Sequence, residues 1–230
     1  MPQGIRNQKE QEVSKMSVFI GLLFLVVVIG IGVWRMRKAV RVPEEELVKA
    51  KPPPFLKGIF VHPGHAWVEV LQPSLVTVGA DDFTNSVFGS VDKLTLPEQG
   101  TLIQQGGRAW TLSRGKRELV QTSPITGRVV EINRQLKSDP QLLSQKDTGR
   151  SWILKVKPIK LKTELQNLLH GKMLSRWNQA VKDQLVATLT TAQFPVLQEG
   201  GEIKPDLGNE LTSEQWEKVA GEFFAPAKRK

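Results

Sequence analysis

Cysteine is absent from this sequence of 230 residues, and histidine occurs only three times. Without cysteine there can be no disulfide framework, no zinc site built on thiolates and no cysteine nucleophile. A metal held by His62 and His65 would lack evident third and fourth ligands, because the Pro63-Gly64 pair between them indicates a turn. The phosphate-binding pattern Gly-x-x-x-x-Gly-Lys and the nucleophile pattern Gly-x-Ser-x-Gly are also missing. The sequence therefore lacks the cysteine residues and the motifs on which common catalytic sites are built.

The charge balance is uneven along the chain. Lysine and arginine number 32 against 23 acidic residues, which gives a net charge of +9. More than half of this surplus lies within residues 1–58, which hold 10 basic and 5 acidic residues. A nucleic-acid site usually places its basic residues on a folded face, often with aromatic side chains between them. We therefore expect membrane association and no binding of nucleic acid.

An uncharged apolar run from Met16 to Trp34 predicts a transmembrane helix over residues 16–35. About 19 residues at roughly 1.5 Å rise span the hydrocarbon core of a bilayer. The alternative is a signal peptide, but the run ends in Trp-Arg-Met-Arg-Lys and no small-residue cleavage site follows. More basic residues follow the run than precede it, so we expect a single-pass membrane protein whose C-terminal domain is cytoplasmic.

Changes in composition predict the domain organisation. Residues 1–15 form an N-terminal tail, and the proline-rich stretch 36–58 reads as a linker after the membrane helix. Residues 59–158 contain short alternating apolar runs separated by turn signals, which is typical of a compact β-sandwich or barrel. The runs lie at 67–70, 75–78, 91–96, 108–112, 118–122, 127–133 and 152–157. Residues 159–230 form a helical C-terminal extension, and the fold class is mostly β.

Helix signals occur at three places. A short helix is expected at Asp82–Phe88, with Asp81 or Asp82 as its N-cap. These two carboxylates could also form an acid/base pair, but neighbouring carboxylates at a helix start are far more often a cap and a partner of the helix dipole. Residues 160–190 repeat apolar side chains at helical spacing, with a break at Gly171, and the capping box Thr212–Gln215 predicts a last helix through Phe224.

The segment Arg108–Gly127 reads as strand, tight turn and strand, with Lys116 at the turn. An amine at a hairpin tip projects into solvent, and it is a suitable attachment point for an amide-linked arm. Spacing alone favours a solvated turn lysine over an attachment point at Lys116. Trp67, Trp110 and Trp152 occupy strand positions and are expected in the core.

Several motifs in order resemble the H protein of the glycine cleavage system, a lipoyl carrier of barrel-sandwich hybrid fold. The family's His-Glu-Trp-Val, Ala-Thr-Val-Gly, Gly-Asp-Val, Leu-Pro-Glu-x-Gly and Ala-Pro-Val-Ser-Gly signatures have counterparts here. The matching stretches are Gly64–Val68, Val76–Phe83, Gly89–Val91, Leu96–Gly100, Ser123–Asn133, Asp139–Leu143 and Gly149–Ile153. The family's lipoyl lysine precedes the proline of its Ala-Pro-Val-Ser-Gly motif by eight residues, and Lys116 precedes Pro124 by the same interval.

The resemblance implies a protein without catalysis of its own. Lipoate on Lys116 would carry an aminomethyl group between glycine-cleavage enzymes, after attachment by a lipoate-attaching enzyme. The sequence departs from the family at the tip, where Ser113 replaces a glutamate and Arg114 and Arg117 add positive charge. One alternative is therefore an unlipoylated scaffold or accessory subunit of a membrane complex. Another is a periplasmic adaptor of an export pump, although the long coiled-coil hairpin of that class is missing.

Overall fold

The structure is a computed structural model that describes residues 58–144, 151–189 and 201–224. The predicted transmembrane helix at 16–35, the N-terminal tail and all but the last residue of the predicted linker lie outside the described residues. Within the described ranges, no helix combines the length and the apolar character that a membrane crossing requires.

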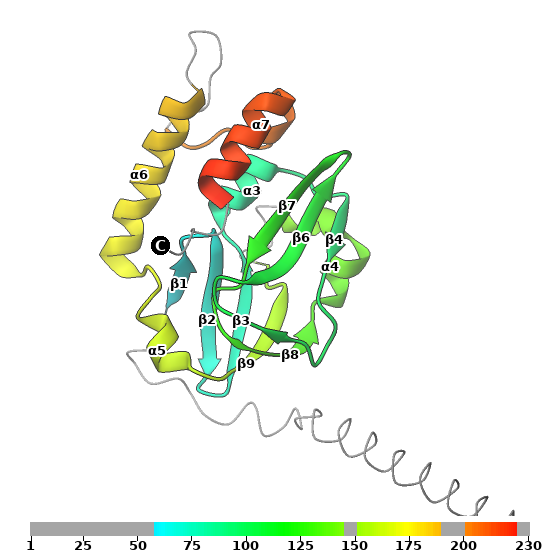
Figure 1. The fold of residues 1–230 in the computed structure, drawn as a ribbon, viewed down its shortest axis with the longest axis vertical. Coiled ribbons are helices and arrows are strands. Elements are labelled where there is room, and N and C mark those ends of the chain that lie inside the picture. Colours follow the sequence, from blue (N-terminus) through cyan, green and yellow to red (C-terminus); the bar gives the residue numbers. More distant parts are fainter. Residues whose placement is uncertain (1–57, 145–150, 190–200, 225–230) are drawn as a thin grey trace, which may run out of the picture. The chain divides into compact units, whose positions relative to one another are not determined.

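Two antiparallel sheets form the centre of the domain (Figure 1). The larger sheet has the strand order β1-β2-β3-β9-β8-β5 and the smaller one the order β4-β6-β7. Antiparallel neighbours joined by short turns are what the repeated turn signals predict. The strands are β1 (Ile59–His62), β2 (Ala66–Gln72), β3 (Leu75–Ala80), β4 (Lys93–Thr95), β5 (Leu102–Ile103), β6 (Arg108–Arg114), β7 (Arg117–Thr122), β8 (Gly127–Ile132) and β9 (Leu154–Pro158).

Apolar side chains from both sheets meet in one core. Val68 and Val78 of the larger sheet and Leu112 of the smaller sheet are at most 1% exposed and belong to a single buried cluster. Trp110 also lies in this cluster at 1% exposure, and its Nε1 donates to Oε1 of Gln121 at 3.0 Å. A buried indole N–H needs such a partner, so this pair fixes β6 against β7.

Close backbone contact explains the glycine of the Ser-Pro-Ile-Thr-Gly stretch. Gly127 begins β8 and pairs with Pro158 of β9. A Cβ on Gly127 would lie 2.4 Å from the carbonyl oxygen of Lys157 and 2.6 Å from Cγ1 of Val156. Any larger residue would therefore push β8 and β9 apart.

Helices surround the sheets. The predicted helix is confirmed as α3 (Asp82–Phe88), with Asp81 as the N-cap. The expected break between two helices is present at residues 166–170, and Gly171 is the first residue of α6. The capping box at Thr212 is also present, but the last helix passes into a π-helical turn before it ends. The remaining elements are α4 (Arg134–Ser138), η2 (Pro140–Leu143), α5 (Leu161–Leu165), α6 (Gly171–Leu189), η4 (Leu207–Glu210), α7 (Ser213–Val219) and η5 (Ala220–Phe224).

Two expectations about the strands were wrong, and two strands were not predicted. The run 91–96 is a strand only at Lys93–Thr95, and neither β1 nor the two-residue β5 was expected. Trp152 lies ahead of β9 and is only partly buried, with the Lys155 ammonium 4.8 Å from its ring centroid. Short strands such as β5 carry too few residues for an alternating pattern to show.

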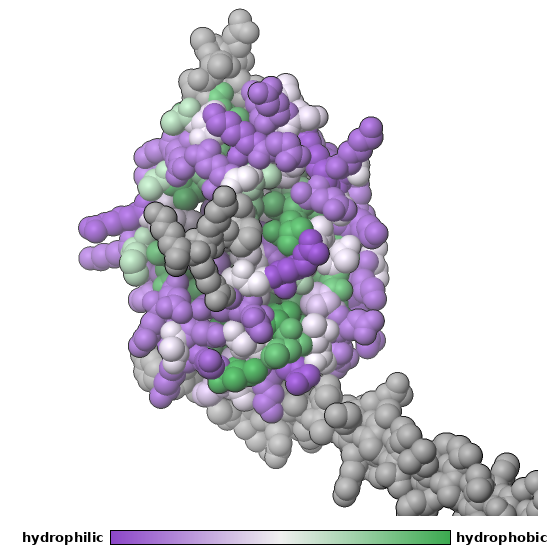
Figure 2. Space-filling view, in the orientation of Figure 1, coloured by the Kyte–Doolittle hydropathy of each residue, from purple (hydrophilic) through white to green (hydrophobic). Residues whose placement is uncertain are grey.

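The domain presents a mainly hydrophilic face, on which hydrophobic residues gather near the middle (Figure 2). The exposed large hydrophobic side chains among the described residues are Leu71, Leu102, Ile159 and Met173. These four residues come from separate parts of the chain. Single exposed apolar residues of this kind are normal for a folded domain.

Candidate functional site

The hairpin formed by β6 and β7, here called the attachment hairpin, places Lys116 at its tip. Arg114 pairs with Arg117, so the turn consists of Gly115 and Lys116 alone. Gly115 has φ +54°, and Lys116 is not among the residues with positive φ. Two-residue hairpins with glycine at the first turn position match the right-handed twist of the strands. The glycine therefore allows the tight turn that puts the lysine at the apex.

The tip is exposed, and the hairpin becomes buried a few residues away from it. Lys116 is exposed, and its side chain makes no hydrogen bond or ion pair with any residue that the structure describes. Two pairs further from the turn than Arg114 and Arg117, Leu112 and Leu119 face each other across the two strands, 1% and 3% exposed. The backbone N–H of Gly115 donates to Oδ2 of Asp92 at 2.9 Å. The amine thus stands free on a turn whose backbone is held.

The two arginines beside the turn are engaged by the C-terminal part of the chain. Nη1 of Arg114 lies 3.3 Å from Oδ1 of Asp206. Nη2 of Arg117 donates to the carbonyl oxygen of Leu211 at 2.6 Å, and its Nη1 donates to the carbonyl oxygen of Gly208. The positive charge expected at the tip is therefore directed largely toward the chain's own C-terminal segment.

A second polar cluster, centred on His65 and Asp81, is buried behind α3. Nδ1 of His65 lies 2.8 Å from Oδ2 of Asp81, and both residues are almost completely buried. Oδ1 of Asp81 accepts from the backbone N–H of Thr84 at 2.8 Å and from its hydroxyl at 3.0 Å. The backbone carbonyl of His65 accepts from Nε2 of Gln121 at 3.1 Å. These bonds join the turn before β2 to α3 and β7.

The geometry decides between the two interpretations of Asp81 and Asp82. Burial alone would raise the pKa of the Asp81 carboxyl, but the charge and hydrogen bond of His65 and the bonds from Thr84 hold that pKa below its ordinary value. Both oxygens of Asp81 are already bonded, whereas Asp82 is exposed on the first turn of α3. Asp81 is thus an ionised cap that is bonded to a buried histidine, and it has no free oxygen for acid/base work.

The His62-Pro-Gly-His65 motif forms a turn, as predicted. Nδ1 of His62 accepts from the backbone N–H of Gly64 at 3.0 Å, and burial lowers the pKa of His62 with a smaller contribution from His65. His65 has a left-handed backbone, and its ring packs face to face with Phe83 at a centroid distance of 4.2 Å. Each imidazole thus bonds through Nδ1 to a neighbouring group, which gives the motif a structural role.

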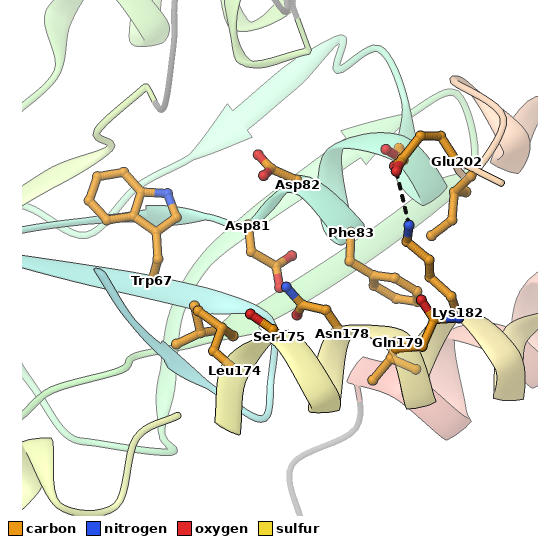
Figure 3. A pocket seen from close by; sticks show the side chains of 14 residues that line it. Trp67, Asp81, Asp82, Phe83, Leu174, Ser175, Asn178, Gln179, Lys182 and Glu202 are labelled. Atoms are coloured by element: carbon orange, nitrogen blue, oxygen red, sulfur yellow. Dashed lines mark hydrogen bonds and ion pairs between the residues drawn. The ribbon is translucent and has the colours of Figure 1, made fainter. Parts of the chain in front are cut away.

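A groove of about 380 Å³ lies between the start of α3 and one face of α6 (Figure 3). Ser175, Asn178 and Gln179 from α6 point toward the α3 side, where Asp81 and Asp82 lie (Figure 3). At one end, Nζ of Lys182 lies 3.1 Å from Oε1 of Glu202. Lys116 does not line this groove. The structure therefore keeps the acidic pair and the attachment lysine in separate places.

Sequence reasoning missed the partners of the attachment hairpin. Asp206 and Leu211 are about ninety residues away from the arginines they contact, and no local pattern announces such a pairing. The sequence carries no signal for these contacts, because arginines beside a two-residue turn can equally be solvated.

The known proteins that this chain resembles include glycine cleavage H proteins. A family model described as the glycine cleavage H-protein matches residues 60–181, just over half of the chain. The probable glycine cleavage system H protein of Pyrococcus furiosus is 29% identical over 121 residues, which cover 53% of this chain and 90% of that protein. The glycine cleavage system H protein of Coprothermobacter proteolyticus is 34% identical over 98 residues, which cover 43% of this chain and 77% of that protein.

Among solved structures, a glycine cleavage system H protein from Mycobacterium marinum aligns with a TM-score of 0.41 and 22% identity, covering 44% of this chain and 83% of that one. The match to the family model begins in β1, crosses both sheets and the attachment hairpin, and ends within α6. The chain therefore belongs to the glycine cleavage H-protein family.

Proposed function

We propose that this protein is a lipoyl carrier in glycine cleavage, with lipoate joined by an amide bond to Nζ of Lys116. Proteins of the H-protein family carry lipoate on a lysine and catalyse no reaction themselves. The observation that carries the proposal is the position of Lys116, exposed at the apex of a two-residue hairpin and eight residues before Pro124.

The residues around Lys116 fit a covalent arm. Amide formation converts the ammonium to a neutral group, and this change breaks no ion pair with any described residue. Leu112 and Leu119 anchor the hairpin in the core through side chains that face away from solvent, so an arm at the tip would not displace them. A hairpin apex also leaves space on several sides for an arm and for the enzymes that approach it.

The chain's contribution to the reaction is to hold and present the arm. Lipoate, when bound, would supply a cyclic disulfide that opens to take up an aminomethyl group on one sulfur, is left as a dithiol once that group is released, and is restored when the dithiol is oxidised. The tether keeps this group within a small volume near any docked enzyme, which raises its effective concentration without new contacts. We propose the glycine-cleavage enzymes and a lipoate-attaching enzyme as the partners of this surface.

Intact-mass analysis of the protein isolated from its native host tests this proposal. We expect the mass to exceed that of the chain by one lipoyl group, and proteolytic fragments should place the increment on the fragment that contains Lys116. An unmodified chain from cells supplied with lipoate would contradict the proposal and favour the scaffold interpretation.

We also propose that residues 16–35 anchor the protein and that the domain faces the cytoplasm. The support is the uncharged run from Met16 to Trp34 and the larger number of basic residues after it. A carrier held at the membrane would confine its arm to enzymes that reach the bilayer surface.

Protease accessibility in vesicles from the native host tests this orientation. We expect the domain to be digested in inside-out vesicles and protected in right-side-out vesicles, with digestion in both once detergent is added. Digestion of intact right-side-out vesicles would place the domain on the other side. Release of the protein by alkaline carbonate would contradict the anchor itself.

A further inference from the structure

The described C-terminal segment, residues 201–224, is called the strap here. It consists of η4, α7 and η5 with the residues that precede and join them. The strap lies beyond residue 181, where the match to the H-protein family ends. In Figure 1 it runs between α6 and the attachment hairpin, with α7 beside the upper part of β7. Its position raises the question of what it does to the hairpin.

The strap covers an edge strand. In the order β4-β6-β7, β7 has a strand neighbour on one side only. Such an edge leaves backbone groups unpaired and is commonly covered by another element. Here η5 packs against β7, and Arg117 at the start of β7 reaches the carbonyls of Gly208 and Leu211. The strap is thus held beside β7 by packing and by the side chain of Arg117.

Arg117 is the strongest link between the strap and the hairpin. Its guanidinium donates to two strap carbonyls at once and lies 5.6 Å from the ring centroid of Trp216. Trp216 is 3% exposed and packs edge to face on Phe88 of α3, with centroids 5.5 Å apart. A planar guanidinium that bonds and stacks at the same time is held in a narrow range of geometries.

On the other side of the turn, Arg114 reaches the same strap. Oδ1 of Asp206 accepts from Arg114 at 3.3 Å and from the backbone N–H of Ser90 at 2.7 Å. The carboxylate therefore connects the hairpin to the residues that follow α3. Arg114 and Asp206 are both partly exposed, so this ion pair is weaker than the bonds of Arg117.

The strap is itself seated firmly on the barrel. A Cβ on Gly208 would lie 2.5 Å from the carbonyl oxygen of Val87, so the backbone of η4 packs directly on α3. At the other end, the ring of Phe224 lies 5.1 Å from the ring of His65. A segment fixed at both ends can hold the hairpin in place.

We propose that the strap positions the attachment hairpin for the enzymatic attachment of lipoate, with Arg114 and Arg117 as positioning residues. This inference rests on the proposed modification of Lys116. The two arginines that depart from the family's lipoyl-lysine motif are the ones that bind the strap, which lies outside the family match. The altered motif and the added segment therefore form one unit, in which the strap holds a turn that presents its lysine to the attaching enzyme.

The full chain with Arg117→Met tests the proposal, and Arg128→Met is its matched control. Arg128 also donates from Nη1 to a backbone carbonyl, that of Gly100 at 2.6 Å, but it lies on β8. The first measurement is amide hydrogen exchange of fragments that cover residues 110–119 in the unmodified protein. The second is the rate at which a lipoate-attaching enzyme adds lipoate to each variant, followed by intact mass.

We expect Arg117→Met to accelerate exchange at the tip about tenfold or more, because two bonds from a charged donor are lost. We also expect slower lipoate attachment, while Arg128→Met should match the unchanged chain in both measurements. Arg117→Lys keeps the positive charge but loses the two-donor geometry of the guanidinium. Its exchange rate and its attachment rate should lie between those of Arg117→Met and the unchanged chain. If Arg117→Met unfolds the domain, Arg114→Met serves in its place with a smaller expected effect.

Two results would overturn the inference. Exchange at the tip that is no faster in Arg117→Met than in Arg128→Met would show that the strap does not hold the hairpin. Faster exchange with an unchanged attachment rate would show that holding the hairpin has no role in modification. These results can be told apart from a failure of the proposed function itself. In that case even the unchanged chain would accept no lipoate at Lys116, although its amide exchange could still be measured.

Discussion

Replacing Lys116 with arginine is expected to abolish the lipoyl mass increment completely. Arginine keeps the positive charge and a similar length, but its guanidinium stays protonated and cannot act as the amine nucleophile in amide formation. Because the Lys116 side chain has no partner among the described residues, the substitution should leave the fold unchanged. The measurement is intact mass after expression in the native host, with unfolding temperature as the check on folding.

Lys93→Arg is the matched control for this experiment. Lys93 is exposed on β4 and pairs in register with Ser113, three residues before Lys116. It lies in the same small sheet, so an enzyme that modified lysines loosely would reach it as well. We expect Lys93→Arg to retain the full increment and to support glycine cleavage with the partner enzymes, and Lys116→Arg to support none. An increment that survives in Lys116→Arg would move the attachment site elsewhere.

Replacing Asp81 with alanine is expected to cost about 2–4 kcal/mol of unfolding free energy. About 1 kcal/mol comes from the lost N-cap of α3. The rest comes from Nδ1 of His65, which is 1% exposed and would be left without its partner at 2.8 Å. The measurement is urea unfolding of the full chain in mild detergent at pH 7, followed by tryptophan fluorescence.

Acid should reduce the difference between the unchanged chain and Asp81→Ala. The folded-state pKa of Asp81 lies below the ordinary value of 3.8, so its stabilising effect is present above that pH. The effect is lost as the pH falls through the folded pKa, because the carboxyl then takes up a proton. Asp81→Asn, which can still cap the helix, should lose less than Asp81→Ala, and the exposed neighbour Asp82→Ala should lose under about 1 kcal/mol. Equal losses for Asp81→Ala and Asp82→Ala would contradict a structural role for the buried pair.

Local patterns predicted most of the barrel and the place of the attachment lysine. The cap at Asp81, the two-residue turn at Gly115-Lys116 and the capping box at Thr212 all depend on residues within four positions of one another. Such signals survive in the sequence because short-range backbone geometry determines them. The position of Lys116 could therefore be expected before any contact in three dimensions was known.

The surroundings of that lysine could not be predicted in the same way. Arg117 suggested a basic, exposed tip, whereas in the fold its guanidinium bonds to the carbonyls of Gly208 and Leu211. Backbone carbonyls carry no sequence signature, since every residue has one. Resemblance to the family gave no guidance either, because the matched region ends before the strap begins.

Because α6 is continuous, this protein cannot be cut at the end of the family match without cutting through a helix. The helix runs without interruption from Gly171 to Leu189, and the family match ends at residue 181 in its middle. A chain shortened at that alignment boundary would lose Leu185 and Leu189, which are 0% and 3% exposed. The residues beyond the family match thus share a helix with the matched domain, and grafting them onto another H protein would require transplanting that helix too.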